Sequence, residues 1–455
     1  LEPGVPVHRL PRTLTALLLL VLVALPARAA MLADSTTSES WRLDNGLEVR
    51  TRHIPGAKSI AIALTFRAGR GYEPADLEGL AELLAELEFT SAAGEFPDRT
   101  REEMTSLRPM GWDVHTGRSL VRFTEIVNRA QLPGALHQFA TRLAGLTLTD
   151  ASLKTAVAQV RRDAGSRYFG PPADVLYWRS DAIARGADDA KLLRLASLPG
   201  LSRLTTRDVA ARLRTFYQPG NAALALAGDL SGTDVHALVQ AVFAKLLGGP
   251  AMPDTVGSRL SGSRRETSWK SLTGAAGVIA AHAPALTDSL HPAFFLGMVV
   301  TGAAFNKDWG APLAPLTARF QYSLLDDPEL IRFYPPLPSD TSDPEVVAGA
   351  LYEQFMVTGG QIVSVEILNR VRQSVRWLVG GELPDELIAR MRLDPGGLGS
   401  VAKNAAARAL WHGDVFWAGY LDRLDHLNLG HSNFYEWLTD PAHQTVVLLV
   451  PPKPR

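Results

Sequence analysis

The feature that most constrains this 455-residue sequence is that its two halves follow the same order of segments. The first half opens with strand-like segments at 41–52 and 59–67 and continues into a helix near Asp76. It closes with an amphipathic helix that ends near Tyr217 and with an apolar strand at 222–227. An order that recurs within one chain indicates two structural units of the same kind.

The second half repeats these landmarks more loosely. A strand-like segment at 274–282 precedes a helix-like stretch at 291–301, and the half closes with a helix around Tyr435 and a strand at 445–450. Between the landmarks both halves read as mainly helical. The sequence therefore predicts an α+β fold of two homologous lobes, each a mostly antiparallel sheet covered by helices.

Composition shifts set the expected boundaries. Residues 248–270 are rich in Gly, Pro, Ser and charge, which predicts a linker between a first lobe at 30–247 and a second lobe at 271–455. Residues 1–29 combine basic residues, a 12-residue apolar run at 14–25 and an Ala-Arg-Ala pattern at their end. This is typical of a cleaved signal peptide, because the run is well short of the ~20 residues of a membrane-spanning helix.

An uncleaved N-terminal anchor is the alternative for that segment. With cleavage, we expect a periplasmic or secreted protein with no membrane partner. Lys and Arg total 46 against 47 for Asp and Glu, and this balance argues against nucleic-acid binding. The chain contains no cysteine, so any metal site would have to come from His, Asp and Glu.

Several short motifs carry a resemblance to a known family. They are Leu-Asp-Asn-Gly-Leu at 43–47, Gly-Leu-Ala-Glu-Leu-Leu-Ala-Glu-Leu-Glu-Phe at 79–89, Leu-Thr-Thr-Arg-Asp-Val at 204–209, Phe-Tyr-Gln-Pro-Gly-Asn-Ala at 216–222 and Gly-Asp-Leu at 228–230. In this order they resemble the pitrilysin/insulinase zinc peptidases, which include the mitochondrial processing peptidase and bacterial two-subunit relatives. The resemblance covers most of 41–247 and is looser in the second half.

Active members of that family carry an H-x-x-E-H motif on the first helix. Two histidines four apart bind zinc from one helix face, and the glutamate activates the bound water. The register of 79–89 places these three positions at Glu82, Ala85 and Glu86, and the resemblance places the third ligand near Asp163. All three motif residues are replaced, so we expect no zinc and no general base.

A carboxylate site for Ca²⁺, Mg²⁺ or Mn²⁺, built from Glu82, Glu86 and Asp163, is chemically possible. The sequence favours a simpler interpretation, in which Glu82 and Glu86 are charges on a solvated helix face. The closest histidine pair, His426 and His431, is five apart and does not have the spacing of a two-ligand helix site.

The family also implies substrate contacts from the second lobe, an arginine and a tyrosine. Arg319 and Tyr322 are the nearest candidates, and a packed tyrosine beside an exposed arginine is the alternative. The glycine-rich segment at 396–399 lacks a strand-to-helix phosphate context and is interpreted as a turn.

The resemblance thus implies a non-catalytic subunit that joins a catalytic homologue with an intact H-x-x-E-H motif, with the zinc in that partner and unfolded peptide as substrate. Two alternatives remain open at this point. One is a weak metallopeptidase that uses carboxylate ligands, and the other is a freestanding scaffold or peptide-binding protein.

Overall fold

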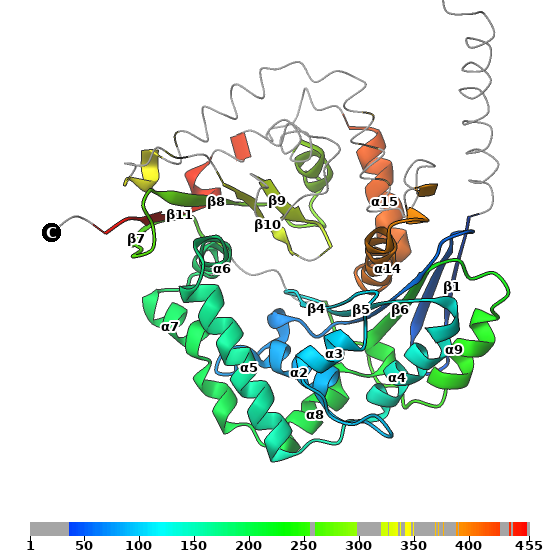
Figure 1. The fold of residues 1–455 in the computed structure, drawn as a ribbon. Coiled ribbons are helices and arrows are strands. Elements are labelled where there is room, and N and C mark those ends of the chain that lie inside the picture. Colours follow the sequence, from blue (N-terminus) through cyan, green and yellow to red (C-terminus); the bar gives the residue numbers. More distant parts are fainter. Residues whose placement is uncertain are drawn as a thin grey trace, which may run out of the picture.

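The computed structural model describes residues 36–254, 260–297, 320–325, 327–334, 391–427 and 440–452, together with a few separate residues between 337 and 437. Figure 1 shows two β-sheets with helices packed around them. The signal-peptide prediction, Arg319 and His431 lie outside the described residues.

The first sheet has six strands in the order β1-β2-β6-β3-β5-β4. β2 and β6 run parallel, and the other neighbours are antiparallel. The strands are β1 (Thr37–Arg42), β2 (Glu48–His53), β3 (Ile60–Phe66), β4 (Trp112–Thr116), β5 (Val121–Val127) and β6 (Ala222–Gly228).

The second sheet has five strands in the order β7-β11-β8-β10-β9. β7 and β11 run parallel and the remaining pairs are antiparallel, as in the β2-β6-β3-β5-β4 part of the first sheet. The strands are β7 (Ser263–Ser268), β8 (Ala276–His282), β9 (Phe320–Ser323), β10 (Asp327–Phe333) and β11 (Gln444–Val450). The predicted α+β fold of two homologous lobes is confirmed.

One boundary differs from the sequence-based expectation. β7 lies inside the segment 248–270, which its composition marks as a linker, and it pairs with β11 over residues 263–268. Edge strands carry polar and charged side chains on their solvated positions, so composition alone does not separate such a strand from a linker.

Helices connect many of the strands along the chain. They are α2 (Leu80–Thr90), α3 (Arg101–Ser106), α4 (Leu132–Ala144), α5 (Asp150–Phe169), α6 (Pro172–Ala184), α7 (Asp189–Ser197), α8 (Thr206–Phe216), α9 (Val235–Phe243), α14 (Pro395–Leu410) and α15 (Gly413–Asp425). The predicted turn at 396–399 is wrong, because these glycines form the first turn of α14. None of the helices in the described ranges has both the length and the apolar character that crossing a bilayer requires.

Both faces of the first sheet are buried, and they differ in side-chain size. Along β3, large residues such as Ile62 and Leu64 face α2, and Ala61 and Ala63 point to the other side, as the two-residue period of a strand requires. α14 lies against the alanine face of this sheet (Figure 1). Its Ala402 belongs to the same apolar cluster as Ala61 and Ala63. Small side chains on both surfaces allow the helix to approach the sheet closely.

The second sheet is covered by a helix that comes from the first half of the chain. α6, a helix of the first half, packs on β8 and β11, and its Val175 and Ile183 join Val278 and Val447 in one apolar cluster (Figure 1). Each half of the chain therefore contributes a helix to the sheet of the other half.

Candidate functional site

α2, the helix on which the resemblance places the metal-binding motif, begins after a glycine that no other residue can replace without strain. Gly79 precedes α2 with φ +83°, and a Cβ at this position would lie 2.6 Å from Leu198 Cδ1. The carboxylate of Glu73 accepts hydrogen bonds from the backbone N–H groups of Gly79 at 3.2 Å and Ala81 at 2.8 Å. This carboxyl group fixes the start of α2 and satisfies two donors that a helix leaves open.

α2 is buried on all sides from Leu80 to Phe89. Glu82 is 8% exposed and Glu86 is 5% exposed, so the interpretation of a solvated helix face is wrong. Because burial of an unpaired carboxylate is costly, the two side chains need cationic partners inside the protein.

Glu82 has two such partners, which come from distant parts of the chain. Its Oε1 lies 3.5 Å from Nη1 of Arg70 and 3.1 Å from Nη1 of Arg167 on α5. Burial acts to raise the pKa of Glu82, but the two guanidinium charges outweigh it and the pKa is lowered. Glu82 is therefore an ionised carboxylate between two arginines.

The neighbouring carboxyl group of Glu73 behaves in the opposite way. Its burial and the negative charge of Glu82 raise its pKa well above the usual value. The pKa values of the two carboxyl groups thus shift in opposite directions within one site, and the arginines neutralise Glu82.

The other two motif positions offer no metal site of the expected kind. Glu86 pairs with Nη2 of Arg101, and Ala85 is a buried methyl group. A methyl group cannot accept a proton from a metal-bound water, so the residue at the expected position of the general base cannot act as a base.

The predicted third ligand is not directed to this helix. Asp163 on α5 accepts a hydrogen bond from Nε2 of Gln159 at 2.9 Å. Arg167, one turn further along α5, is the residue that reaches Glu82. Arg70 and Arg167 were not predicted from the sequence, in which the available signal is that carboxylates on an apolar helix require cations.

These residues do not fit zinc. A zinc site needs three protein ligands that converge with free lone pairs, whereas Glu82 and Glu86 already bind guanidinium groups. Over the described parts of the chain, no group of three His, Asp or Glu side chains is placed to hold a metal ion. The arginines supply positive charge beside the carboxylate at the first ligand position.

The arginine pair connects to a larger ion-pair network between the lobes. The guanidinium carbons of Arg70 and Arg167 each lie 4.7 Å from the ring centre of Trp178 on α6. One turn later on α6, Asp181 lies 3.3 Å from Arg185 and 3.3 Å from Arg332 of β10. Burial acts to raise the pKa of Asp181, but these cations lower it to about 2.

Glu329 of β10 completes the connection between the lobes. It pairs with Arg185, and its Oε2 lies 3.2 Å from Nε of Arg118, in the loop between β4 and β5. The first sheet, α6 and the second sheet therefore meet in one charged cluster.

The substrate-binding candidate Tyr322 is engaged inside the second lobe. Its hydroxyl lies 3.1 Å from Nε2 of His291 and 3.2 Å from the carbonyl oxygen of Pro328. The Nδ1 of His291 lies 2.8 Å from the hydroxyl of Tyr420. This arrangement corresponds to a packed tyrosine. His426 caps its own helix through a contact with the backbone of Asp422 and is not drawn into a site.

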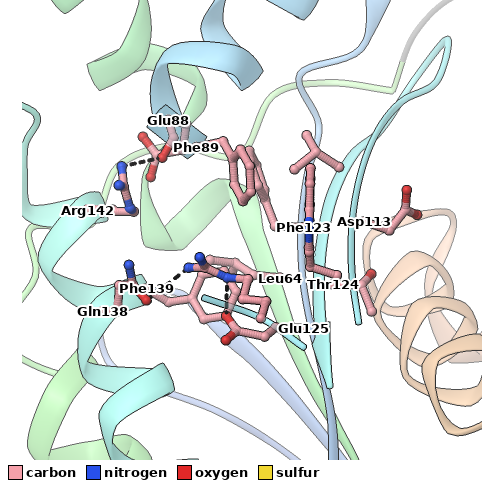
Figure 2. A pocket seen from close by; sticks show the side chains of 13 residues that line it. Leu64, Glu88, Phe89, Asp113, Phe123, Thr124, Glu125, Gln138, Phe139 and Arg142 are labelled. Carbon is pink, nitrogen blue, oxygen red and sulfur yellow. Dashed lines mark hydrogen bonds and ion pairs between the residues drawn. The ribbon is translucent and has the colours of Figure 1, made fainter. Parts of the chain in front are cut away.

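A second polar region lies at the other end of α2, in a cavity that Figure 2 shows between α4 and strands β4 and β5. Nε of Arg108 lies 3.1 Å from Oε2 of Glu125, and Nη1 of Arg142 donates to the backbone oxygen of Glu88 at 2.7 Å. Burial raises the pKa of the Glu88 carboxyl group to about 8, and Arg142 only partly opposes this. The lining thus stabilises a neutral carboxylic acid.

The fold and the altered metal helix define a protein with the architecture of the M16 peptidases. No protein-family model matches the chain. A curated relative, the zinc protease PqqE of Helicobacter pylori, is 24% identical over 216 residues, which are 46% of this chain and 47% of that protein. The match therefore spans about half the length of this relative.

Solved structures extend the likeness to nearly the whole chain. A protease from Helicobacter pylori matches with a TM-score of 0.68 and 15% identity, over 91% of this chain and 100% of that one. The periplasmic protease PqqL from Escherichia coli matches with a TM-score of 0.65 and 14% identity, over 91% of this chain and 48% of that one.

A third match is a peptidase M16 inactive domain from Pseudomonas fluorescens, with a TM-score of 0.60 and 16% identity, over 91% of this chain and 98% of that one. At these identities the structures show the fold. Together with the relative, they confirm the resemblance to the pitrilysin/insulinase family.

Proposed function

We propose that the chain is the non-catalytic, peptide-binding subunit of an exported two-subunit M16-type metallopeptidase. The observation that carries the proposal is the ion-paired Glu82 between Arg70 and Arg167, next to Ala85 at the base position. A lone chain of this kind has neither a zinc ligand set nor a base on α2. The zinc and the chemistry would then come from a partner with an intact H-x-x-E-H motif.

The retained fold supports a role in holding peptide. β4 forms one edge of the first sheet, and an extended peptide can add to such an edge through main-chain hydrogen bonds without any catalytic residue. The end of β4 lies at the arginine pair, because Nη1 of Arg70 donates to the carbonyl oxygen of Thr116 at 2.6 Å. A peptide along β4 would therefore run toward the altered metal position.

Pairing is supported by the proportions of a structural neighbour. The chain aligns with 48% of the PqqL chain, so two units of this size correspond to one such molecule. Export is supported by the apolar run at 14–25 with its Ala-Arg-Ala pattern and by the fact that PqqL, the structural neighbour, is a periplasmic protease.

The test mixes the purified mature chain with an H-x-x-E-H homologue from the same organism. We expect the two proteins to co-elute in size-exclusion chromatography and cleavage of an unstructured peptide to rise above that of the homologue alone. Unchanged cleavage without co-elution would argue for a freestanding binding protein. Chelator-sensitive cleavage by the lone chain would instead revive a catalytic role.

A further inference from the structure

Arginine side chains gather where the two lobes meet. Five guanidinium groups of this region, here called the arginine cluster, form two ion-pair groups: Arg70 and Arg167 share one carboxylate, and Arg118, Arg185 and Arg332 share two others. Three carboxylates pair with them: Glu82, Asp181 and Glu329. Arg70 and Arg167 share the single carboxylate Glu82 among their described ion pairs.

Two members of the arginine cluster retain donors and remain accessible. The side chain of Arg167 is 28% exposed, and among the described residues only its Nη1 has a hydrogen-bond partner. The side chain of Arg70 is 25% exposed, and its described hydrogen bonds also involve Nη1 alone. A guanidinium group has five N–H donors in a planar fork, so both can bind a further planar anion.

The location of these donors favours a peptide as the source of the anion. Arg70 contacts the last residue of the edge strand β4, Thr116. Arg70 and Arg167 also flank Trp178, whose ring offers an apolar surface beside the charges. A carboxylate on an extended peptide would meet both features at once.

We propose that the arginine cluster selects peptides that carry a carboxylate, which would bind Arg70 and Arg167 at the altered metal position. This inference rests on the proposed peptide-binding function and adds the chemistry of the ligand. The carboxylate can come from an Asp or Glu side chain or from a peptide C-terminus.

Calorimetric titration of the full mature chain with three unstructured peptides of equal length tests the inference. One peptide has central glutamates and an amidated C-terminus, the second has glutamines at those positions and an amidated C-terminus, and the third differs from the second only by a free C-terminal carboxylate. Because hydrogen bonds to charged groups are the stronger ones, we expect a carboxylate peptide to bind about tenfold more tightly than the neutral one. The first and third peptides separate the two sources.

Substitutions test whether the preference for a carboxylate peptide depends on the arginine cluster. Arg167→Gln is expected to abolish the preference for a carboxylate peptide over the neutral one, and Arg167→Lys to retain part of it. The matched control is Arg162→Gln, on the same helix but exposed and in contact with Gln159. If circular dichroism shows that Arg167→Gln does not fold, Arg70→Gln takes its place.

The possible results distinguish the preference for a carboxylate from peptide binding itself. Equal affinity of the wild type for all three peptides, or equal losses in Arg167→Gln and Arg162→Gln, overturns the carboxylate preference and leaves peptide binding intact. Failure of every peptide to bind overturns both the inference and the proposed peptide-binding function.

Discussion

Glu82 on α2 and Arg167 on α5 are 85 positions apart in the chain, and their side chains meet at 3.1 Å. In the family that this chain resembles, the corresponding helices bring ligands to a metal ion. Here the same two helices are joined by a direct ion pair, to which Arg70 adds a second cation. An ion pair thus joins the two helices on which the metal-ligand positions were expected.

Zinc content is the first expected consequence. The chain purified without chelators should contain far less than one zinc per molecule, because Glu82 and Glu86 are bound by arginines and Ala85 has no donor. Elemental analysis by mass spectrometry measures this directly. One tightly held zinc per chain would show that the ligand positions assigned to α2 are incorrect.

Loss of the central carboxylate should destabilise the protein. Glu82→Gln leaves Arg70 and Arg167 without their shared anion, and since both arginines are partly exposed we expect a loss of about 2 kcal/mol in the free energy of unfolding. Urea denaturation at neutral pH gives the value. The exposed Glu102→Gln serves as the control and should change stability little.

The same variant has an expected pH dependence. The pKa of Glu82 is lower in the folded protein than in the unfolded chain, where it is about 4.3. The group therefore stabilises the fold above that pH, and this contribution disappears as the pH falls through the lowered pKa. The difference between wild type and Glu82→Gln should shrink in acid, and a constant difference would contradict the ion-pair assignment.

Glu88 should show the opposite sign. Its pKa of about 8 in the fold lies above the unfolded value of about 4.3, so the folded state holds a proton that the unfolded chain releases between these values. Wild-type stability from this group therefore falls as the pH rises toward 8. Glu88→Gln cannot ionise, and its stability relative to wild type should increase from pH 5 to pH 8 by about 3–4 kcal/mol, since each pH unit between the two pKa values changes the stability by about 1.4 kcal/mol.

Denaturation curves of Glu88→Gln and wild type at several pH values provide the measurement. Glu102→Gln is again the matched control, because this exposed carboxylate lies on the neighbouring helix α3. Parallel pH profiles for Glu88→Gln and the wild type would contradict a neutral Glu88.

Close packing between α14 and the first sheet gives a fifth prediction. Ala402 is fully buried against the alanine face of β3 and β6, so Ala402→Leu inserts three carbon atoms where there is no space. We expect a loss of about 1–3 kcal/mol or a failure to fold. Thermal unfolding compares it with Asn404→Leu, at a half-buried position of the same helix, which should cost less.

Local patterns were sufficient to predict the strand repeats and the helix that carries Glu82, Ala85 and Glu86. They were not sufficient for α14, because three glycines near its start lower the intrinsic preference for helix and only packing against the first sheet compensates for this. Nor could they identify Arg70 and Arg167, since an ion pair between distant segments leaves no local periodicity.

The burial of α2 could have been predicted. Seven of its eleven residues are Leu, Ala or Phe, and they occur on all sides of the helix, which is typical of a buried helix and not of a solvated one. The three glutamates then require internal partners. Which cations these are depends on the three-dimensional arrangement of α5 and the segment before α2.

The reciprocal use of α6 and α14 bears on how this chain can be divided. A cut between residues 248 and 262 would separate the two halves in sequence, yet it would leave β8 and β11 without α6 and expose the alanine face of β3 and β6. Neither fragment would enclose its own sheet. The two halves are therefore one cooperative folding unit, and expressing either half alone should give an aggregating product instead of an autonomous domain.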